Sequence, residues 1–224
     1  MNVQEDILLI DKPKGITSFD VIRRLRAQTG IKKYGHAGTL DPLATGLMII
    51  GKEKGTKKLE GFLKLDKEYI ADIRLGERRS TGDLEGEILE EKEVSGLPRA
   101  QIEAAVALLE GEQFLPVSAY SAIKKQGVPL YKKARAAASK GEVFTEVPTR
   151  RMVVYEAVLL EAADVLIGNK KRVVVRVRFH VGSGTYIRSL SEELGRLLSF
   201  PATLQDLRRT KIGNFRVEDA QQIA

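Results

Sequence analysis

The chain has 224 residues, a formal net charge of +7, no cysteine and no tryptophan. Without cysteine it cannot form disulfides, zinc–thiolate sites, iron–sulfur clusters or a cysteine nucleophile, and with only His36 and His180 as imidazoles a metal site built by the protein is not expected. The N-terminal apolar run is too short for a signal peptide and no apolar stretch approaches the roughly 20 residues of a transmembrane helix, so we expect a cytoplasmic protein.

Hydrophobic periodicity predicts strands and helices along the whole chain. In chain order these are a strand at 7–10, a turn at 11–15, a helix capped by Thr17 or Ser18 and ended by Gly30, a loop at 32–46, a strand at 47–50, a strand at 69–75, a charged loop at 77–86, a helix at 101–109, a basic helix opened by Pro129 at 129–139, strands at 152–160 and 173–181, and a helix at 186–198. The rhythm is not uniformly strand–helix–strand, and several strands look half-exposed. We therefore expect an α+β fold with a mixed, largely antiparallel sheet flanked by helices. Residues 139–148 are the nearest thing to a linker, so we expect one domain over 1–224, with room for a lobed insertion.

The excess of 37 Lys and Arg over 30 Asp and Glu favours a polyanionic partner, although a charge that serves only solubility explains it equally well. Basic residues cluster at 52–58, 170–172 and 208–211.

Two phosphate-binding patterns are nearly matched and are rejected. The segment 46–52 approaches a phosphate-binding loop, but Glu53 stands where Ser or Thr would hold magnesium, and 47–50 reads as a buried strand. The segment 182–184 lacks the third glycine of a dinucleotide fingerprint.

The loop 35–46, GHAGTLDPLATG, carries a single carboxylate, Asp41, five residues after His36. Its three glycines allow positive φ angles or a close approach of the backbone to another group. Asp-Pro is also typical of a turn or a helix start with Asp as the cap, and the residue types alone favour that structural interpretation. His36 alone is more typical of a satisfied loop histidine than of a catalyst.

Arg188 falls in the first turn of the helix at 186–198, where the helix dipole disfavours a cation. It therefore needs an anion, either a carboxylate or a phosphate, unless it is a surface arginine that points into water. Tyr69 is by composition a strand aromatic, for which core packing is the ordinary role.

Five segments together resemble the TruB family of tRNA pseudouridine synthases. They are LIDKPKG at 9–15, GHAGTLDPLATG at 35–46, KEYIADIRLG at 67–76, the segment Tyr120–Lys124 with Gly127, Leu130-Tyr131 and Ala134-Arg135, and GTYIRSL at 184–190. They occur in the order of the family and cover most of the chain.

The resemblance implies the pseudouridine synthase fold and an RNA isomerase. Its substrate would be the uridine at position 55 in the TΨC loop of tRNA, and the base would be detached and rejoined through carbon 5. The resemblance also implies no cofactor and no metal, with the TΨC arm of tRNA as the partner and no membrane, and we expect a monomer.

Site residues follow from the same resemblance, position by position. Asp41 matches the catalytic aspartate, Tyr69 the tyrosine that stacks on the target base and is a candidate base, and Arg188 the arginine paired with the carboxylate. Substrate-binding positions are His36, which supports the flipped-out nucleotide, Tyr186, a neighbouring tyrosine, Leu207, which lines the pocket, and Lys12, a lysine near the site. Whether Asp41 attacks the sugar, attacks the pyrimidine ring or abstracts a sugar proton is left open.

Three departures from the family pattern stand out. We expect no separate C-terminal RNA-binding domain of the kind that many bacterial relatives carry. Residues 181–183 are Val-Gly-Ser where relatives often have Cys-Ser-Lys, so a basic residue is lost, and 115–117 are Leu-Pro-Val where a proline pair is more usual. One alternative is a non-catalytic tRNA-binding or tRNA-folding module. A glycoside hydrolase is a second alternative, and it is disfavoured because this sequence has no second carboxylate in a comparably constrained motif.

Overall fold

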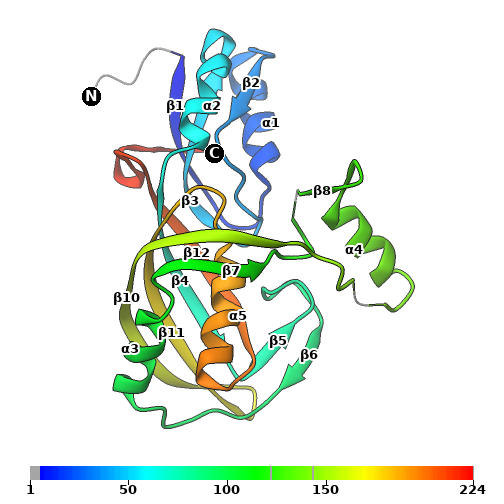
Figure 1. Cartoon of the computed structure of the whole chain (residues 1–224). Coiled ribbons are helices and arrows are strands. Elements are labelled where there is room, and N and C mark those ends of the chain that lie inside the picture. The colour runs from blue at the N-terminus through cyan, green and yellow to red at the C-terminus, as the bar shows by residue number, and fades with distance from the viewer. Residues whose placement is uncertain (1–5, 122, 143, 224) are drawn as a thin grey trace. The chain divides into compact units, whose positions relative to one another are not determined.

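The computed structural model describes residues 6–121, 123–142 and 144–223, and so leaves out Ala122 of the Tyr120–Lys124 segment. The chain folds into two compact units (Figure 1). Unit 1 contains residues up to Ala71 together with Arg178–Ser183 and Asp206 onward, and unit 2 contains Asp72–Val177 and Gly184–Gln205. The linker-like segment 139–148 lies inside unit 2 and does not separate the units, and a single domain over 1–224 stays a prediction.

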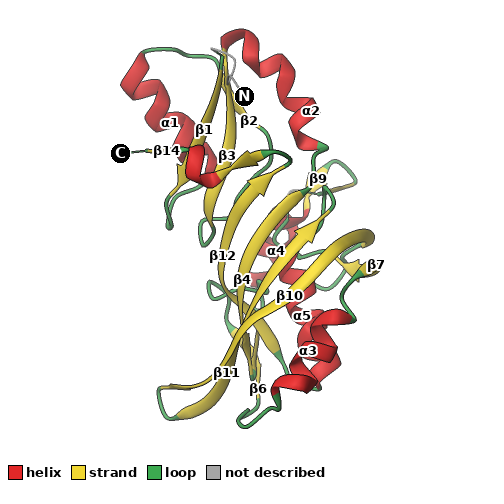
Figure 2. Cartoon of the chain, turned by 90° about the vertical axis from the view of Figure 1, so that its left-hand side faces the viewer, coloured by secondary structure: helices red, strands yellow, loops and turns green. Residues whose placement is uncertain are grey.

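The secondary structure is a mixture of strands and short helices (Figure 2). The helices are α1 Ser18–Thr29, η1 Glu53–Lys58, α2 Leu59–Leu63, α3 Arg99–Ala107, α4 Leu130–Ala138, α5 Ile187–Leu198 and η2 Val217–Asp219. The strands are β1 Ile7–Lys12, β2 Tyr34–His36, β3 Thr45–Lys52, β4 Lys67–Leu75, β5 Glu77–Arg79, β6 Ile88–Glu91, β7 Gly111–Pro116, β8 Lys124–Lys125, β9 Val128–Pro129, β10 Thr149–Ile167, β11 Lys170–Val181, β12 Ala202–Ile212, β13 Phe215–Arg216 and β14 Gln221–Gln222. None of the helices within the described ranges has the length and apolar character needed to cross a bilayer.

The main sheet is mixed. Its hydrogen-bonded order is β14-β1-β3-β12-β4-β11-β10-β7, with β2 on β3 and β13 on β12. The pairs β1–β3, β2–β3, β12–β13 and β10–β7 are antiparallel, whereas β1–β14 and β3–β12 are parallel. The expected α+β fold with a mixed, largely antiparallel sheet is confirmed.

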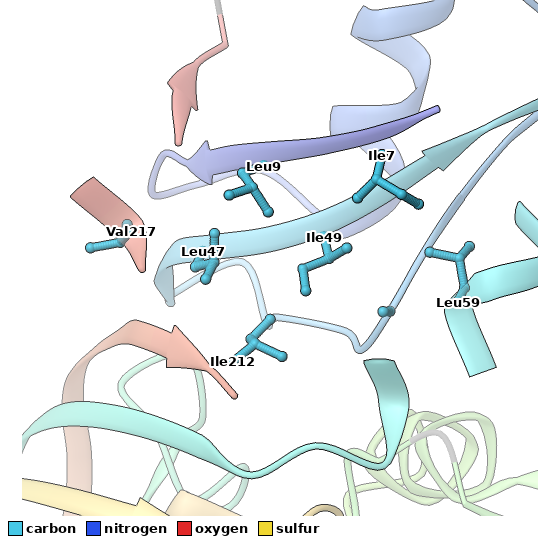
Figure 3. Packing of buried hydrophobic residues seen from close by; sticks show 8 residues of the cluster. Ile7, Leu9, Leu47, Ile49, Leu59, Ile212 and Val217 are labelled. Atoms are coloured by element: carbon cyan, nitrogen blue, oxygen red, sulfur yellow. The ribbon is translucent and has the colours of Figure 1, made fainter. Parts of the chain in front are cut away.

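Unit 1 is organised around β3, whose residues Leu47, Met48, Ile49 and Ile50 are all fully buried. Burial on both faces of the strand explains the unbroken apolar run in the sequence. Figure 3 shows Leu47 and Ile49 beside Ile7 and Leu9 of β1, with Ile212 close to Leu47. Burial of each of these side chains contributes about 1.5–3 kcal/mol to the free energy of folding. The cluster therefore holds β3 against β1 and β12.

Helix α1 begins and ends at the residues that the sequence indicates. The Thr17 hydroxyl accepts the N–H of Asp20, and the Asp20 carboxylate accepts the N–H of Thr17 in return, so two otherwise unpaired donors are satisfied. Gly30 ends the helix in the left-handed conformation, with φ of 74°.

Helix α5 opens the last part of unit 2. Its buried apolar residues Ile187, Leu190, Leu194 and Leu198 recur every three or four positions and form one face. The helix begins at Ile187, which places Arg188 in its first turn.

Several elements differ from the sequence-based expectations. The loop expected at 32–46 contains β2, and the charged loop at 77–86 begins with β5, because short polar strands pair with a neighbour that the local pattern does not reveal. Strand β10 is far longer than 152–160, and β7 and β12 were not anticipated.

Two of the basic clusters are also not free surfaces. Arg208 pairs with Asp11 at 2.8 Å and Lys211 with Glu68 at 2.9 Å. Arg172 is buried against Glu91 at 2.8 Å.

Candidate active site

Asp41 begins a tight turn between β2 and β3 in unit 1. The N–H of Ala44 donates to the Asp41 carbonyl at 3.0 Å, and no helix follows. The turn suggested by Asp-Pro is therefore real, whereas the helix start is wrong. The turn hydrogen bond is accepted by the backbone carbonyl of Asp41, and the Asp41 side chain is half-buried.

The turn is clamped by Gly15, which lies between β1 and α1, and by Ser18, the first residue of α1. Gly15 donates its N–H to the Pro42 carbonyl at 2.8 Å. The buried Ser18 hydroxyl accepts the N–H of Leu40 at 2.8 Å and donates to the Leu40 carbonyl at 2.9 Å. Buried hydrogen bonds of this kind are costly to leave unmade, so the residue immediately before Asp41 is held in place.

Strand β12 holds the other side of the loop. Arg208 and Arg209 pair with Thr45 and Gly46 in a parallel register. Gly46 has φ of +106°, and a Cβ there would lie 2.2 Å from the Arg209 carbonyl oxygen, so only glycine permits this approach. Four residues after Asp41, the Thr45 hydroxyl donates to the Leu207 carbonyl at 3.5 Å.

His36 is the last residue of β2, opposite Ile50, and not a loop histidine. Burial lowers its pKa below the ordinary value; a hydrogen bond with the Gly38 backbone works against this shift, and the charge of Arg209 adds to it. Its buried Nδ1 has no hydrogen-bond partner within the described part of the chain. Burial therefore favours the neutral form of the His36 imidazole.

Lys12 is fully buried at the end of β1. Its ammonium group donates to the carbonyls of Pro13 at 3.0 Å and Ile16 at 2.8 Å. These bonds shape the segment between β1 and α1, from which Gly15 reaches the Asp41 turn. Lys12 thus stabilises the backbone at 13–16, a role that the resemblance does not specify. A contact of Lys12 with the substrate stays a prediction.

Tyr69 and Leu207 lie on neighbouring strands of unit 1. Every second side chain of β4 is buried, and Tyr69 belongs to this inward set. Leu207 is buried on β12, which lies between β3 and β4 in the sheet. The order β1-β3-β12-β4 thus brings the strands of Lys12, the Asp41 loop, Leu207 and Tyr69 next to one another.

Arg188 is held inside unit 2 by its side chain and is only 7% exposed. It donates to the carbonyls of Thr81 at 3.0 Å and Tyr120 at 3.1 Å, and it pairs with Asp83 at 3.4 Å. The interpretation as a surface arginine is wrong, and Asp83 is an anion of the kind that the helix position requires.

Asp83 is a buried partner of Arg188 that the sequence analysis does not single out. It is 3% exposed, and it accepts the Thr81 hydroxyl at 2.5 Å and the Glu85 N–H at 3.1 Å. The charges of 77–86 predict only a loop, although an aspartate directly after Gly82 is a turn signal that could have marked it.

Tyr186 is the cap residue of α5 and is half-buried; its carbonyl accepts the Leu190 N–H at 3.2 Å. A pocket of about 360 Å³ in unit 2 is lined by Thr81 and Tyr120, whose carbonyls hold Arg188, together with Arg135 and Phe144.

Nowhere in the described ranges do three His, Asp or Glu side chains gather as a metal site would require.

The predicted site residues are thus divided between the units. Unit 1 holds His36, Asp41, Tyr69, Leu207 and Lys12, and unit 2 holds Tyr186 and Arg188. The pairing of Asp41 with Arg188 that the resemblance implies stays a prediction.

Solved structures that resemble this chain define its class. A crystal structure of a Cbf5-Nop10-Gar1 complex matches 100% of the chain with a TM-score of 0.70 and 27% identity. An H/ACA RNP bound to a substrate RNA containing 2'-deoxyuridine matches 98% with a TM-score of 0.67 and 26% identity. The chain spans about half the length of these two matched chains, 54% and 51%. The chain shares its fold with these two structures.

Sequence comparison identifies the family. Residues 26–187 match the model of the TruB family pseudouridylate synthase (N terminal domain). A tRNA pseudouridine synthase B of Desulfotalea psychrophila is 45% identical over 215 residues, which cover 96% of this chain and 84% of the relative. One of Streptomyces avermitilis is 39% identical over 220 residues, 98% of this chain and 71% of the relative. The chain belongs to the TruB family of pseudouridylate synthases.

Proposed function

We propose that this protein converts the uridine at position 55 in the TΨC loop of tRNA to pseudouridine, with Asp41 as the catalytic carboxylate. The observation that carries the proposal is the Asp41 turn, whose backbone is fixed by Gly15, by Ser18 and by the pairing of β12 with β3. Relatives named tRNA pseudouridine synthase B support the substrate.

The reaction needs a nucleotide outside its stack. A uridine within a folded RNA loop is inaccessible, so the enzyme must extrude it and offer replacement contacts. We assign the stacking contact to Tyr69, support of the flipped nucleotide to His36, and the apolar wall to Leu207. A neutral His36 suits this role, because it can pack against a base without the cost of burying a charge.

The chemistry is an isomerisation without net oxidation or reduction. The bond between N1 and the sugar C1′ breaks, a bond between C5 and C1′ forms, C5 loses a proton and N1 gains one. No redox cofactor is required by this balance. An anionic oxygen held in place can act as nucleophile or base in the cleavage step, and Asp41 provides it.

Two further roles complete the proposal. Arg188 would keep Asp41 ionised and aligned through charge-assisted hydrogen bonds, and Tyr69 would remove the C5 proton after the base has rejoined the sugar. We propose Tyr186 as an aromatic neighbour of the substrate and Lys12 as a residue near the site. We also propose that the enzyme acts as a monomer in the cytoplasm on the TΨC arm.

The test is incubation of the protein with an unmodified tRNA transcript, followed by mapping of pseudouridine at single-nucleotide resolution. We expect one modified position, 55, and no product in a transcript with cytidine at that position. Tight tRNA binding without any pseudouridine would instead support the non-catalytic tRNA-binding or tRNA-folding module. Modification at another position would overturn the substrate assignment alone.

A further inference from the structure

Arg209 is a buried arginine whose side chain touches both ends of the segment 38–47, which contains Asp41 and is called the Asp41 loop below. Only 1% of it is exposed. Its Nε donates to the Leu47 carbonyl at 2.7 Å, and its Nη2 donates to the Gly38 carbonyl at 3.4 Å. Asp41 lies between these two residues in the chain, so one planar guanidinium sets the separation of the loop ends.

The main chain of Arg209 is bound to the same loop. It pairs with Gly46, and the close approach at this point requires the glycine. Side chain and backbone of a single residue thus contact the loop at Gly38, Gly46 and Leu47. Arg208 differs, because its side chain is 41% exposed and turns to Asp11.

Among the residues that the structure describes, no carboxylate forms an ion pair with Arg209. Within the part of the chain that the structure describes, its hydrogen-bond partners are carbonyl oxygens and it forms no ion pair. A buried cation without a counter-charge is costly, whereas an apolar side chain of similar length would fill the same space. Packing alone therefore does not account for an arginine here.

The charge also acts on neighbouring groups. Burial lowers the pKa of Lys67 to about 8, and the Arg209 charge contributes to that shift. The pKa of His36 is lowered first by burial and further by Arg209. Both groups lie close enough to feel the guanidinium, which gives its position an experimental reporter.

We infer that Arg209 is a positioning residue of the isomerisation, which holds the two ends of the Asp41 loop at a fixed separation; this rests on the proposed role of Asp41. Catalysis by a fixed group is steeply sensitive to placement, and a shift of about 1 Å can cost on the order of 10²-fold. A lysine retains the charge but has no fork with which to reach both carbonyls.

The test compares Arg209→Lys and Arg209→Met with a matched control, Arg216→Met, which removes an exposed arginine of the same unit. Single-turnover conversion of a tRNA transcript is measured at saturating enzyme, and affinity for the transcript is measured separately. We expect both Arg209 variants to slow the chemical step by roughly 10- to 100-fold at unchanged affinity. The control should keep the wild-type rate of the chemical step.

Histidine NMR gives a readout that general loss of stability does not mimic. The protein has only two histidines, so the His36 and His180 resonances are readily distinguished. Arg209→Met should raise the pKa of His36 because a nearby positive charge is lost, whereas Arg209→Lys should leave it low. A slow Arg209→Met variant with an unchanged His36 titration would contradict the placement of the charge.

The outcomes separate cleanly. An Arg209→Lys variant as fast as wild type overturns the inference. Failure of both variants to fold, judged by circular dichroism and thermal melting, also overturns it, because the role is then support of the fold. A wild-type protein that forms no pseudouridine overturns the proposed function, and this is seen before any variant is measured.

Discussion

The two charged groups assigned to catalysis are held in opposite ways. In unit 1, Asp41 is fixed through its backbone, by bonds to its own carbonyl and to Leu40 and Pro42 on either side. In unit 2, Arg188 is fixed through its side chain, by two carbonyls and a carboxylate. Replacing the Asp41 side chain should therefore alter the reaction with little effect on the fold. Replacing the Arg188 side chain should alter both, because that side chain makes the structural contacts. Substitutions should separate the two cases.

Asp41→Asn should have the largest effect on activity. The substitution preserves the turn, because the turn uses the backbone, but it removes the anionic oxygen. We expect turnover to fall by at least about 10³-fold, the scale of removing a key catalytic group, with tRNA affinity and melting temperature retained. Turnover and affinity measured on one transcript test this, and unchanged pseudouridine formation would eliminate the assignment of Asp41.

Arg188 variants should affect both the fold and the reaction. Arg188→Met leaves the buried Asp83 carboxylate without its cation, for which we expect a loss of about 3–5 kcal/mol in the free energy of unfolding. Arg188→Lys keeps the charge but loses the fork that spans Thr81, Tyr120 and Asp83, so it should be less destabilising and should still impair turnover. Denaturant unfolding and turnover are measured together, and full activity of Arg188→Lys would mean that Arg188 is not a catalytic partner.

Ser18→Ala tests how much the hydrogen bonds between Ser18 and Leu40 contribute to the stability of unit 1 and to turnover. The variant removes the buried hydroxyl that both accepts from and donates to Leu40, and leaves those two backbone groups unsatisfied. We expect about 1–3 kcal/mol of destabilisation and a smaller loss of turnover than with Asp41→Asn. Thr29→Ala is a suitable control, because it also removes a hydroxyl from α1, but one whose partners are the Leu25 carbonyl, the Tyr34 hydroxyl and the Ile31 N–H rather than the Asp41 turn. Equal effects of the two variants would contradict the clamp.

The smallest effect concerns acid stability and the pair of His180 with Asp66, whose side chains approach to 2.5 Å. The hydrogen bond from His180 lowers the pKa of Asp66 below its ordinary 3.8. The folded state then binds fewer protons, so this stabilisation is present above about pH 4 and is lost as the pH falls through the folded pKa. The pair is half-exposed, so we expect His180→Gln to cost less than about 1 kcal/mol at pH 7.

The measurement for this pair is the free energy of unfolding at a series of pH values. The difference between wild type and His180→Gln should shrink as Asp66 becomes protonated. A difference that does not depend on pH would mean that His180 contributes by packing alone.

Sequence patterns predict those elements whose own residues carry the signal. The apolar run at 47–50 is the centre of β3 because it is buried on both faces, and Thr17 with Gly30 bounds α1 because caps act locally. The motif around Asp41 is likewise a local signal, and the turn at Asp-Pro follows from it. These features need no knowledge of distant partners.

Tertiary structure alone decides where the charges go. Asp83, Arg172 and Arg209 are charged, yet all three are buried, because their partners come from distant segments: Arg188 for Asp83, Glu91 for Arg172, and the Leu47 carbonyl for Arg209. Strand β2 forms for a similar reason, since β3 supplies the hydrogen bonds that its three residues cannot supply to themselves. A sequence pattern indicates whether each side chain is on average buried or exposed. The tertiary contacts of the folded chain determine where a charged side chain is buried against that average.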